Sequence, residues 1–351
     1  MTRTITPSIS VVIPAWNSRQ YLDECLQSLN DPSSTADEMV IVDNGSSDGT
    51  PTYLSRRYPS ARLIVNALNE GFCHAVNQGV RATRGEWVLV LNADTRLAAG
   101  ALAALAASAR EASDDIGMIG PKLLRMDGQT IDSTGLVLTR ARRFRDRGGG
   151  ESDRGQYDAA GEIAGACAAA VLYRRAMLES IAEDGMYFDE RFFALVDDVD
   201  LAWRARRAGW RAWYEPSAVV YHARNGSGLP CNVRQYLSVR NRCYLLYKHE
   251  TAAGLLKDLP YWLVYDLVRW PYLLATNRLA WRALREVLRN GPTMRRQVVR
   301  ENRTQDASNR TQVNPGRPLT FNIRPLTSDP SSATPRWSNV NSRWSKVASP
   351  P

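Results

Sequence analysis

The stretch that decides the fold is E-W-V-L-V-L-N-A-D-T, residues Glu86 to Thr95. Its apolar run, Trp87 to Leu91, is rich in valine and leucine, which is typical of a strand buried on both faces of a parallel sheet. The run stops at Asn92 and Asp94. Ligands in open α/β sheets bind beyond the carboxyl ends of the strands, so these two side chains suggest a metal or phosphate site. An ordinary turn would use the same residue types.

Three other runs, mostly apolar, precede this strand, at residues 9–13, 39–42 and 62–65. Pro14 follows the first and Asp43 the second, while Asn69-Glu70-Gly71-Phe72 comes shortly after the third. Between the runs, apolar positions recur at helical spacing, as in residues 22–29 and 73–82. Strands that alternate with helices predict a doubly wound α/β sheet, in which four strand ends meet at one crevice.

Later segments add further polar groups to this plan. We expect a helix over 98–112, a strand over 116–120, and a mobile loop over the charged, glycine-rich residues 140–154, either a lid or a simple surface loop. A last strand, 218–221, ends at His222. A lone histidine is commonly a hydrogen-bonded structural residue, but a neutral imidazole at a strand end also suits a metal.

Three carboxylates, Asp197, Asp198 and Asp200, fall within four residues. Like charges at this spacing raise one another's pKa, and such clusters are commoner at functional sites than elsewhere. They could also serve the N-terminus of a helix over 199–208, where the macrodipole favours acidic residues. The small residues of Gly165 to Ala170 suit a pocket wall and tight core packing equally well.

Composition limits the classes of protein. The five cysteines are odd in number and include no C-x-x-C pair, which fits a reducing cytoplasm and argues against a disulfide framework or a zinc site. The first eight residues lack an apolar signal segment, so we expect no export. Residues 1–225 hold 25 Lys and Arg against 29 Asp and Glu, whereas residues 226–351 hold 20 against 7. A basic region of this kind indicates an anionic partner surface, and no nucleic-acid recognition motif accompanies it.

The C-terminal part divides in two. Residues 226–300 form a basic, aromatic-rich region whose most apolar stretch is Leu259 to Ala275. As a spanning helix, its Leu and Val residues would contribute about −2 to −4 kcal/mol, but Asp266 and Arg269 would cost roughly 5 to 7 kcal/mol. We therefore expect helices that lie at a membrane surface, or that pack on the first domain. Residues 301–351 are polar and expected to be disordered.

Taken together, the motifs resemble the inverting family 2 glycosyltransferases, closest to their rhamnosyltransferase-like branch. The matching segments are VVIPAWN (11–17), IVDNGSSDGT (41–50), NEGF (69–72), LNADT (91–95) and residues 192–216 with His222. The resemblance covers roughly residues 8 to 225 and implies a GT-A fold, an α/β architecture with a Rossmann-like mixed sheet. We thus expect a catalytic domain over 1–225, followed by a C-terminal helical appendage.

The resemblance also implies roles for individual residues. Asp198 would be the catalytic base, and Asp94 with His222 would hold a divalent cation, Mg or Mn. The other implied sets are nucleotide-binding Pro14, Ala15, Asn17, Asp43, Asn69 and Gly71; donor sugar or diphosphate contacts Asn92, Asp94 and His222; and acceptor contacts Gly165, Ala166 and Asp197. Two positions depart from the family pattern, because Asn92 replaces the first Asp of D-x-D and Asp197 replaces the usual Glu before Asp198.

The implied reaction moves a sugar from dTDP-rhamnose or a UDP-sugar to a glycan or lipid-linked acceptor in cell-surface polysaccharide synthesis. A cation would neutralise the diphosphate that leaves, and a carboxylate would take the acceptor's proton. We expect a cytoplasmic enzyme, peripheral on an anionic inner membrane surface. The alternatives are a nucleotidyltransferase, which would normally carry a glycine-rich phosphate loop after its first strand, and a non-catalytic nucleotide- or glycan-binding protein.

Overall fold

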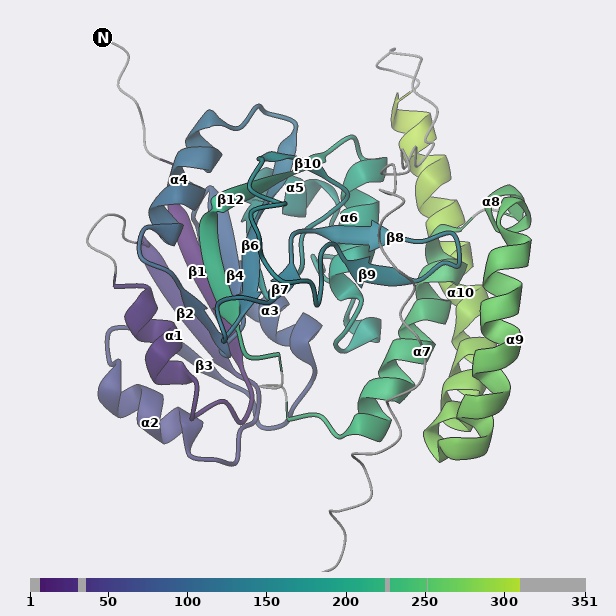
Figure 1. Ribbon diagram of the computed structural model, residues 1–351, viewed down its shortest axis with the longest axis horizontal. Helices are drawn as coiled ribbons and strands as arrows, with labels where there is room; N and C mark the ends of the chain where they lie inside the picture. Colours follow the sequence, from purple (N-terminus) through teal and green to yellow (C-terminus); the bar gives the residue numbers. More distant parts are fainter. Residues whose placement is uncertain (1–6, 31–35, 225–227, 251, 310–351) are drawn as a thin grey trace, which may run out of the picture. The chain divides into compact units, whose positions relative to one another are not determined.

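The structure is a computed structural model that describes residues 7–30, 36–224, 228–250 and 252–309. Its centre is a mixed sheet with the strand order β10-β12-β6-β11-β4-β1-β2-β3, in which β5 also pairs with β12 and β7 with β6 (Figure 1). The predicted α/β architecture is confirmed. Most of the tail for which we expected disorder, residues 310–351, lies outside the described residues, whereas residues 301–309 continue the last helix.

The first half of the sheet is parallel and alternates with helices, as predicted. Its elements are β1 Ile9–Ala15, α1 Leu22–Ser28, β2 Glu38–Asp43, α2 Thr50–Arg57, β3 Arg62–Val65, α3 Phe72–Arg81 and β4 Trp87–Leu91. One detail differs from the prediction, since β1 continues through Pro14. The pairing of β1 with β4 stops at Val12, so the missing N–H of Pro14 costs no bond to that neighbour.

The second half of the sheet mixes strand directions. Its elements are β5 Thr95–Leu97, α4 Ala101–Glu111, β6 Ile116–Arg125, β7 Ile131–Ser133, β10 Gly161–Ile163, β11 Ala170–Arg174, α5 Arg175–Ser180, the 3-10 helix η1 Glu190–Phe192, α6 Asp197–Arg207 and β12 Arg211–His222. Strand β11 runs antiparallel between β4 and β6, while β12 is parallel to β6. The ends of β4 and β12 therefore come together, because His222 pairs with Thr95 of β5.

Both faces of the central strands are buried. Alternate residues point to opposite faces of a strand, so Val88 and Val90 enter one core with residues of α3 and α6, whereas Leu89 and Leu91 enter a second core with residues of α1 and α4. This explains why the run from Trp87 to Leu91 is apolar throughout rather than at every second position.

Residues 140–154, expected as a mobile loop, instead contain ordered structure. Strand β9, Phe144–Asp146, pairs antiparallel with β8, Leu136–Leu138. The turn between them is bonded to the C-terminal helices, because Arg142 donates to Asp258 and to the carbonyl of Gly254, both at 2.9 Å. The glycine-rich composition thus marks a hairpin and its turns.

The C-terminal helices are α7 Cys231–His249, α8 Ala252–Lys257, α9 Leu259–Thr276 and α10 Arg278–Asn309. Helices α7 and α10 pack together through Tyr236, Leu237 and Ala283, and all four helices fall within the same compact unit as the sheet. Within the described residues, we find no helix whose length and apolar character would allow it to cross a membrane.

Candidate active site

The carboxyl ends of β1 and β2 are joined by the loops that follow them. Asn17 donates its backbone N–H to Ser46 Oγ and accepts through Oδ1 from the backbone N–H of Ser47, both at 2.8 Å. Asp43 is fully buried and accepts through Oδ2 from the Ser46 N–H at 3.1 Å. Its Oδ1 has no hydrogen-bond partner within the described residues. Buried carboxylate oxygens are normally satisfied, so this end of the sheet retains an unused acceptor.

Pro14 and Ala15 lie beside this acceptor, since Ala15 pairs in register with Asp43 on the neighbouring strand. The backbone carbonyl of Ala15 accepts from the N–H of Asn44 at 2.8 Å. The end of β1 is thereby fixed against the residue that follows Asp43. These two predicted nucleotide contacts therefore share one strand edge with Asp43.

The loop before α3 reaches the same edge. Asn44 donates through Nδ2 to Asn69 Oδ1 at 2.9 Å and to the carbonyl of Gly71 at 3.0 Å. Gly71 has a φ of 97°, and a Cβ placed there would lie 2.6 Å from the carbonyl oxygen of Phe193. Only glycine fits such a conformation and approach. The predicted residues Asn69 and Gly71 thus connect the β2 end with the loop that leads into α6.

Asp94 and His222 meet where β4 and β12 end. His222 Nε2 lies 3.4 Å from Asp94 Oδ1, and its Nδ1 lies 2.8 Å from Asp132 Oδ2. Burial would lower the pKa of His222, but Asp132 and Asp94 outweigh it and raise that pKa to about 9. Arg224 also bonds Asp132 and reaches Asp146 at 2.5 Å. The predicted pair is therefore one end of a chain of charges that leads to Asp146.

This geometry fits a divalent cation held mainly by a substrate. Among the described residues, no group of three or more His, Cys, Asp or Glu side chains is placed as a complete metal site. Mg²⁺, however, is commonly bound by one or two protein ligands together with phosphate oxygens and water. Asp132 holds the far nitrogen of His222, as carboxylates do behind metal-ligating histidines. Asp94 and His222 can serve as ligands for such an ion if its binding displaces the proton that Asp94 and Asp132 otherwise hold on the imidazole ring.

Asn92 lies beside this pair, at the end of β4. Its backbone N–H donates to the carbonyl of Ala169 at 2.9 Å, and its carbonyl accepts from Thr95. Its side-chain Oδ1 is buried and has no partner in the part of the chain that the structure describes. Two strand ends, at Asp43 and Asn92, thus carry an unused buried acceptor.

Asp197 and Asp198 open α6 and differ in exposure. Asp197 is buried, and burial together with the charge of Asp198 raises its pKa to about 8. Asp198 is half-buried and accepts from the backbone N–H of Ala168 at 3.2 Å. Burial and the charge of Asp146 raise its pKa to about 6. A partly accessible carboxylate with a pKa near neutrality is suited to general-base chemistry.

Gly165 and Ala166, predicted to contact an acceptor, are both buried. A Cβ at Gly165 would lie 2.5 Å from the Cβ of Ala202 on α6, and a Cβ at Gly120 would lie 2.7 Å from that of Ala166. The small residues therefore allow close packing of α6 on the sheet, one of the two interpretations left open by the sequence. Their contact with an acceptor stays a prediction.

Helix α7 is hydrogen-bonded to the loop that immediately precedes Asp197 and Asp198. Phe193, Leu195 and Val196 all have positive φ values, of 65°, 70° and 69°, which are strained for such residues. Asn241 donates through Nδ2 to the carbonyls of Phe192, Ala194 and Leu195, at 2.9, 2.8 and 2.8 Å. The side chain of Asn241 thus stabilises the strained backbone immediately before α6.

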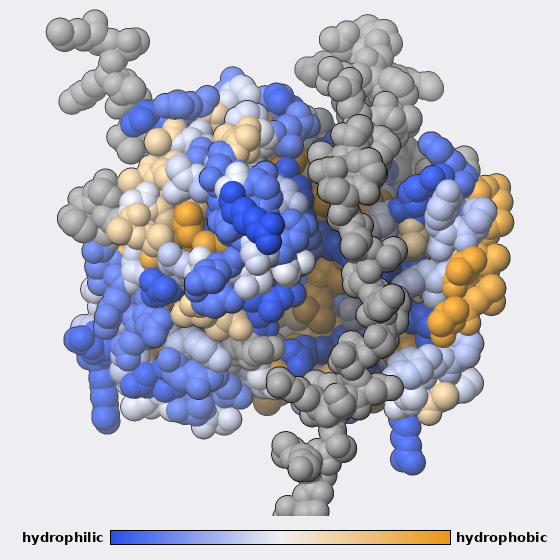
Figure 2. All heavy atoms as spheres, viewed as in Figure 1, coloured by the Kyte–Doolittle hydropathy of each residue, from blue (hydrophilic) through white to orange (hydrophobic). Residues whose placement is uncertain are grey.

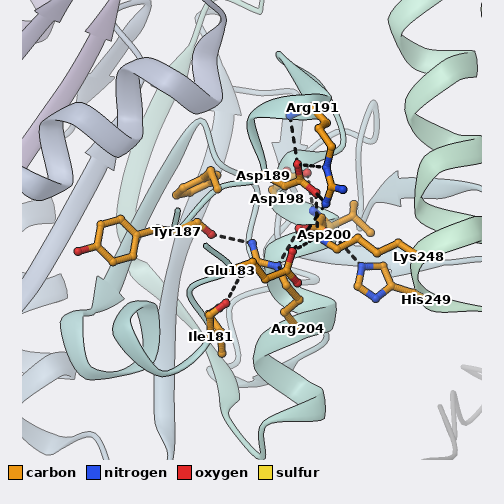
Figure 3. Close-up of polar contacts among 12 residues, drawn as sticks. Ile181, Glu183, Tyr187, Asp189, Arg191, Asp198, Asp200, Arg204, Lys248 and His249 are labelled. Atoms are coloured by element: carbon orange, nitrogen blue, oxygen red, sulfur yellow. Dashed lines mark hydrogen bonds and ion pairs between the residues drawn. The ribbon is translucent and has the colours of Figure 1, made fainter. Parts of the chain in front are cut away.

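The opposite side of α6 carries a buried ion cluster (Figure 3). Lys248 lies 3.0 Å from Asp200 and 2.9 Å from Asp189, while Arg204 lies 2.9 Å from Asp200. Burial would raise the pKa of Asp200, but Lys248 and Arg204 hold it well below its usual value. Burial lowers the pKa of His249 to about 4, so this ring is neutral where Nε2 meets Asp200 at 2.7 Å. The cluster joins α7 to α6 at Asp200, two residues after Asp198.

Several of these residues were not singled out by the sequence reasoning. Asp132 lies in a three-residue strand with no motif of its own. Asn241 and Lys248 are seven residues apart on α7, which places them on one helical face, and both side chains are buried. In the sequence these two residues stand among many other polar ones, so composition predicts a basic appendage and does not mark them.

The order of the mixed sheet and its flanking helices define a GT-A fold, and Asp197 and Asp198 place a carboxylate pair at the start of α6. Residues 10–181 match the sequence model of the family described as Glycosyl transferase family 2. The chain is 30% identical over 249 residues to the N-acetylglucosaminyl-diphospho-decaprenol L-rhamnosyltransferase of Mycobacterium tuberculosis, across 62% of this chain and 76% of that relative. The chain belongs to glycosyl transferase family 2, as the motifs predicted.

Two further comparisons agree with this assignment. The putative teichuronic acid biosynthesis glycosyltransferase TuaG of Bacillus subtilis is 30% identical over 129 residues, 36% of this chain and 51% of that relative. The crystal structure of GalNAc-T7 with UDP, GalNAc and Mn²⁺ has a TM-score of 0.52 at 13% identity. The matched region covers 69% of this chain and 48% of that chain, so the two proteins share a fold.

Proposed function

We propose that this enzyme transfers a sugar, with inversion, from dTDP-rhamnose or a UDP-sugar to a glycan or lipid-linked acceptor in cell-surface polysaccharide synthesis. The observation that carries the proposal is Asp198, a half-buried carboxylate with a raised pKa beside the strand ends. The relative in Mycobacterium tuberculosis supports the choice of substrates, since its name specifies rhamnosyl transfer to a lipid-linked diphosphosugar.

Asp198 acts in this proposal as the general base. Its carboxylate takes the proton of the acceptor hydroxyl while that oxygen forms a bond to the anomeric carbon of the donor. The bond between the anomeric carbon and the diphosphate oxygen breaks, and its electron pair leaves with the nucleotide diphosphate. Attack and departure occur on opposite faces of the sugar, so the anomeric centre inverts. Gly165, Ala166 and Asp197 form the acceptor side of this site.

Asp94 and His222 hold a divalent cation, Mg or Mn, in the proposed enzyme. When bound, the ion neutralises negative charge that grows on the departing diphosphate. Asp132 fixes the orientation of the His222 ring through its Nδ1 contact at 2.8 Å. Asn92, whose neutral Oδ1 lies unused nearby, contacts the donor sugar or phosphate.

The nucleotide lies across the ends of β1 and β2. Asp43 accepts from the edge of a pyrimidine base, since its Oδ1 lacks a partner within the described residues. Pro14, Ala15 and Asn17 line one side of the nucleotide, and Asn69 and Gly71 lie on the other. The enzyme works in the cytoplasm, peripheral on the inner face of the cell membrane, where an anionic surface and a lipid-linked acceptor are available.

A donor screen tests this proposal. Purified protein is incubated with dTDP-rhamnose, UDP-sugars and GDP-mannose, with Mg²⁺, Mn²⁺ or a chelator, and released nucleotide diphosphate is measured. We expect one pyrimidine donor to be hydrolysed, with release stimulated by the cation and diminished in an Asp94→Asn variant. Asp114→Asn, a change at an exposed aspartate, is the matched control.

Each arm can contradict a different part of the proposal. If no donor is bound or hydrolysed, the transfer reaction is wrong for this chain. Tight donor binding without any release would favour a non-catalytic binding protein. Release that is unaffected by the chelator would remove the cation from Asp94 and His222 while leaving the transferase intact.

A further inference from the structure

Helix α9 presents an apolar face to solvent. Its exposed residues, spaced three or four apart, are Pro260, Leu263, Val264, Leu267, Val268, Pro271, Tyr272 and Ala275, with Tyr261 at the edge. Val264 and Val268 are 65% and 72% exposed. The stripe is about 22 Å long at 1.5 Å per residue. Figure 2 shows it as the orange patch at the right edge of the view, over α9.

The polar residues of α9 face the protein instead. Asp266 accepts from Arg242 of α7 at 2.9 Å, and the guanidinium groups of Arg143 and Arg242 lie over the Tyr265 ring at 5.0 and 5.4 Å from its centroid. Leu273 is buried against Val239 and Ala280. A surface helix normally turns its apolar stripe inward, so this orientation is inverted. Large apolar patches that remain exposed generally mark an interaction site.

The exposed charged residues of the C-terminal helices, where their side chains are described, are all of one sign. Within the described side chains of residues 254–294, every exposed charged residue is basic: Lys257, Arg278, Arg282, Arg285 and Arg289. The acidic residues of these helices, Asp258, Asp266 and Glu286, are each paired with an arginine. Trp281 and Leu288 of α10, 53% and 62% exposed, lie between the arginines in sequence. Apolar and aromatic residues bordered by basic ones suit a phospholipid headgroup layer.

We propose that the outward stripe of α9, together with the exposed arginines of α10, is the face by which this protein binds an anionic phospholipid bilayer. This inference rests on the proposed function and specifies which surface meets the membrane. The apolar side chains enter the headgroup and acyl boundary, and the basic side chains attract anionic lipid. The helix lies in the plane of the interface rather than across it.

The face is connected to the candidate active site through the hairpin β8–β9. Arg140 and Arg142, in the hairpin turn, contact Asp258 beside α9 at 3.2 and 2.9 Å. Asp146, at the far end of β9, pairs with Arg224 and raises the pKa of Asp198. Lipid binding at α9 would thus hold the catalytic carboxylate in a fixed relation to a lipid-linked acceptor.

Two other occupants of the face are less compatible with its charge. Residues 310–351 contain six Lys and Arg against one Asp, and such a basic composition does not complement the arginines of α10. A second copy of the chain would bring the same basic residues into contact. An anionic bilayer complements both the apolar stripe of α9 and the exposed arginines of α10.

Vesicle sedimentation tests the inference. Full-length protein is mixed with vesicles of phosphatidylcholine alone, or of phosphatidylcholine with about 30% phosphatidylglycerol. The ionic strength is about physiological. We expect binding to the anionic vesicles and at least about tenfold weaker partition for Val268→Glu. Leu267→Ser, which adds no charge, should weaken binding in the same direction. Met126→Glu changes an exposed apolar residue elsewhere and should bind like the unmodified protein.

Nucleotide release from a donor in solution is measured on the same variants, so that the two proposals can fail separately. The inference predicts unchanged release for Val268→Glu. Absence of vesicle binding by the unmodified protein, or undiminished binding by Val268→Glu, would overturn the membrane face even if the donor screen succeeds. A dimer in sedimentation velocity that Val268→Glu dissociates, without vesicle binding, would identify a second copy as the occupant instead.

Discussion

Asp198 and Asp200 lie two residues apart on α6, yet their surroundings are opposite. Asp200 is fully buried among Lys248, Arg204 and His249, and its pKa is held well below the usual value. Asp198 is half-buried, accepts from the backbone N–H of Ala168 and Val199, and has a pKa raised to about 6. Buried cations balance the charge of Asp200, whereas the charge of Asp198 is only partly compensated.

The difference follows from helix geometry. Successive residues of an α-helix are about 100° apart, so positions i and i+2 point to nearly opposite sides. Asp198 is directed toward the strand ends, and Asp200 is directed toward α7. The cations that neutralise Asp200 also anchor the helix, which leaves Asp198 free of a competing ion pair with Lys248. A dense acidic cluster in sequence thus separates into a candidate catalytic group and a structural one.

The largest effect expected from this comparison is on turnover. Asp198→Asn removes the proposed base while keeping the shape of the side chain, so transfer should fall by about 10³-fold or more. Donor binding should stay nearly unchanged, because the proposed nucleotide contacts lie at the ends of β1 and β2 and before α3, not on α6. The melting temperature should be unchanged or slightly higher, since a poorly compensated charge is removed. Rates, donor affinity and melting temperature are measured on one preparation.

Asp184→Asn makes the same chemical change at an exposed position and is the control. Its rate should equal that of the unmodified protein. Normal turnover by Asp198→Asn would show that the base lies elsewhere in the site. A large loss of stability in that variant would mean that Asp198, like Asp200, is a structural carboxylate, and the comparison would collapse.

The second expected effect is on stability. Lys248→Met leaves Asp200, Asp189 and Glu183 without the buried cation they share, and breaking a buried ion pair by removing one partner costs about 3 to 5 kcal/mol. The free energy of unfolding is measured by denaturant titration. Adding Asp200→Asn to Lys248→Met should recover part of the loss, because the unpaired carboxylate is removed.

Lys257→Met, at an exposed lysine of α8, should change the free energy of unfolding by less than about 0.5 kcal/mol. If Lys248→Met were as mild as this control, the cluster on the α7 side of α6 would not anchor the helix. Equal loss in the single and double variants would show that Asp200 is stabilised by Arg204 and His249 alone.

The parallel half of the fold was readable from sequence for a definite reason. Trp87 to Leu91 and the runs before it are local patterns, and each ends in polar residues at the same sheet edge. The structure brings together Asp94 and His222, which are far apart in the chain, because β5 pairs with β12. That pairing joins three residues of each strand and leaves almost no local signal, so only the family resemblance implied that Asp94 and His222 act together.

The role of α7 could not be read in the same way. Buried Arg240, Asn241, Lys248 and His249 satisfy backbone carbonyls and carboxylates that lie about fifty residues earlier in the chain. Composition alone predicts that this segment belongs to a basic surface region. Burial of a polar residue depends on its partners, and those partners become visible only when the tertiary structure places them.

The smallest expected effect concerns the pH dependence that separates the two carboxylates. Asp198 is active as the carboxylate, so kcat/KM should be constant above about pH 6, the value to which burial and Asp146 raise its pKa, and fall about tenfold per unit at lower pH. Asp146→Asn removes one cause of that rise, so the inflection should move to lower pH. Asp127→Asn, at an exposed aspartate, should leave it in place. If Asp146→Asn left the inflection in place, the titrating group would not be Asp198. The proposed contrast between Asp198 and Asp200, on opposite faces of α6, would then lose its functional meaning.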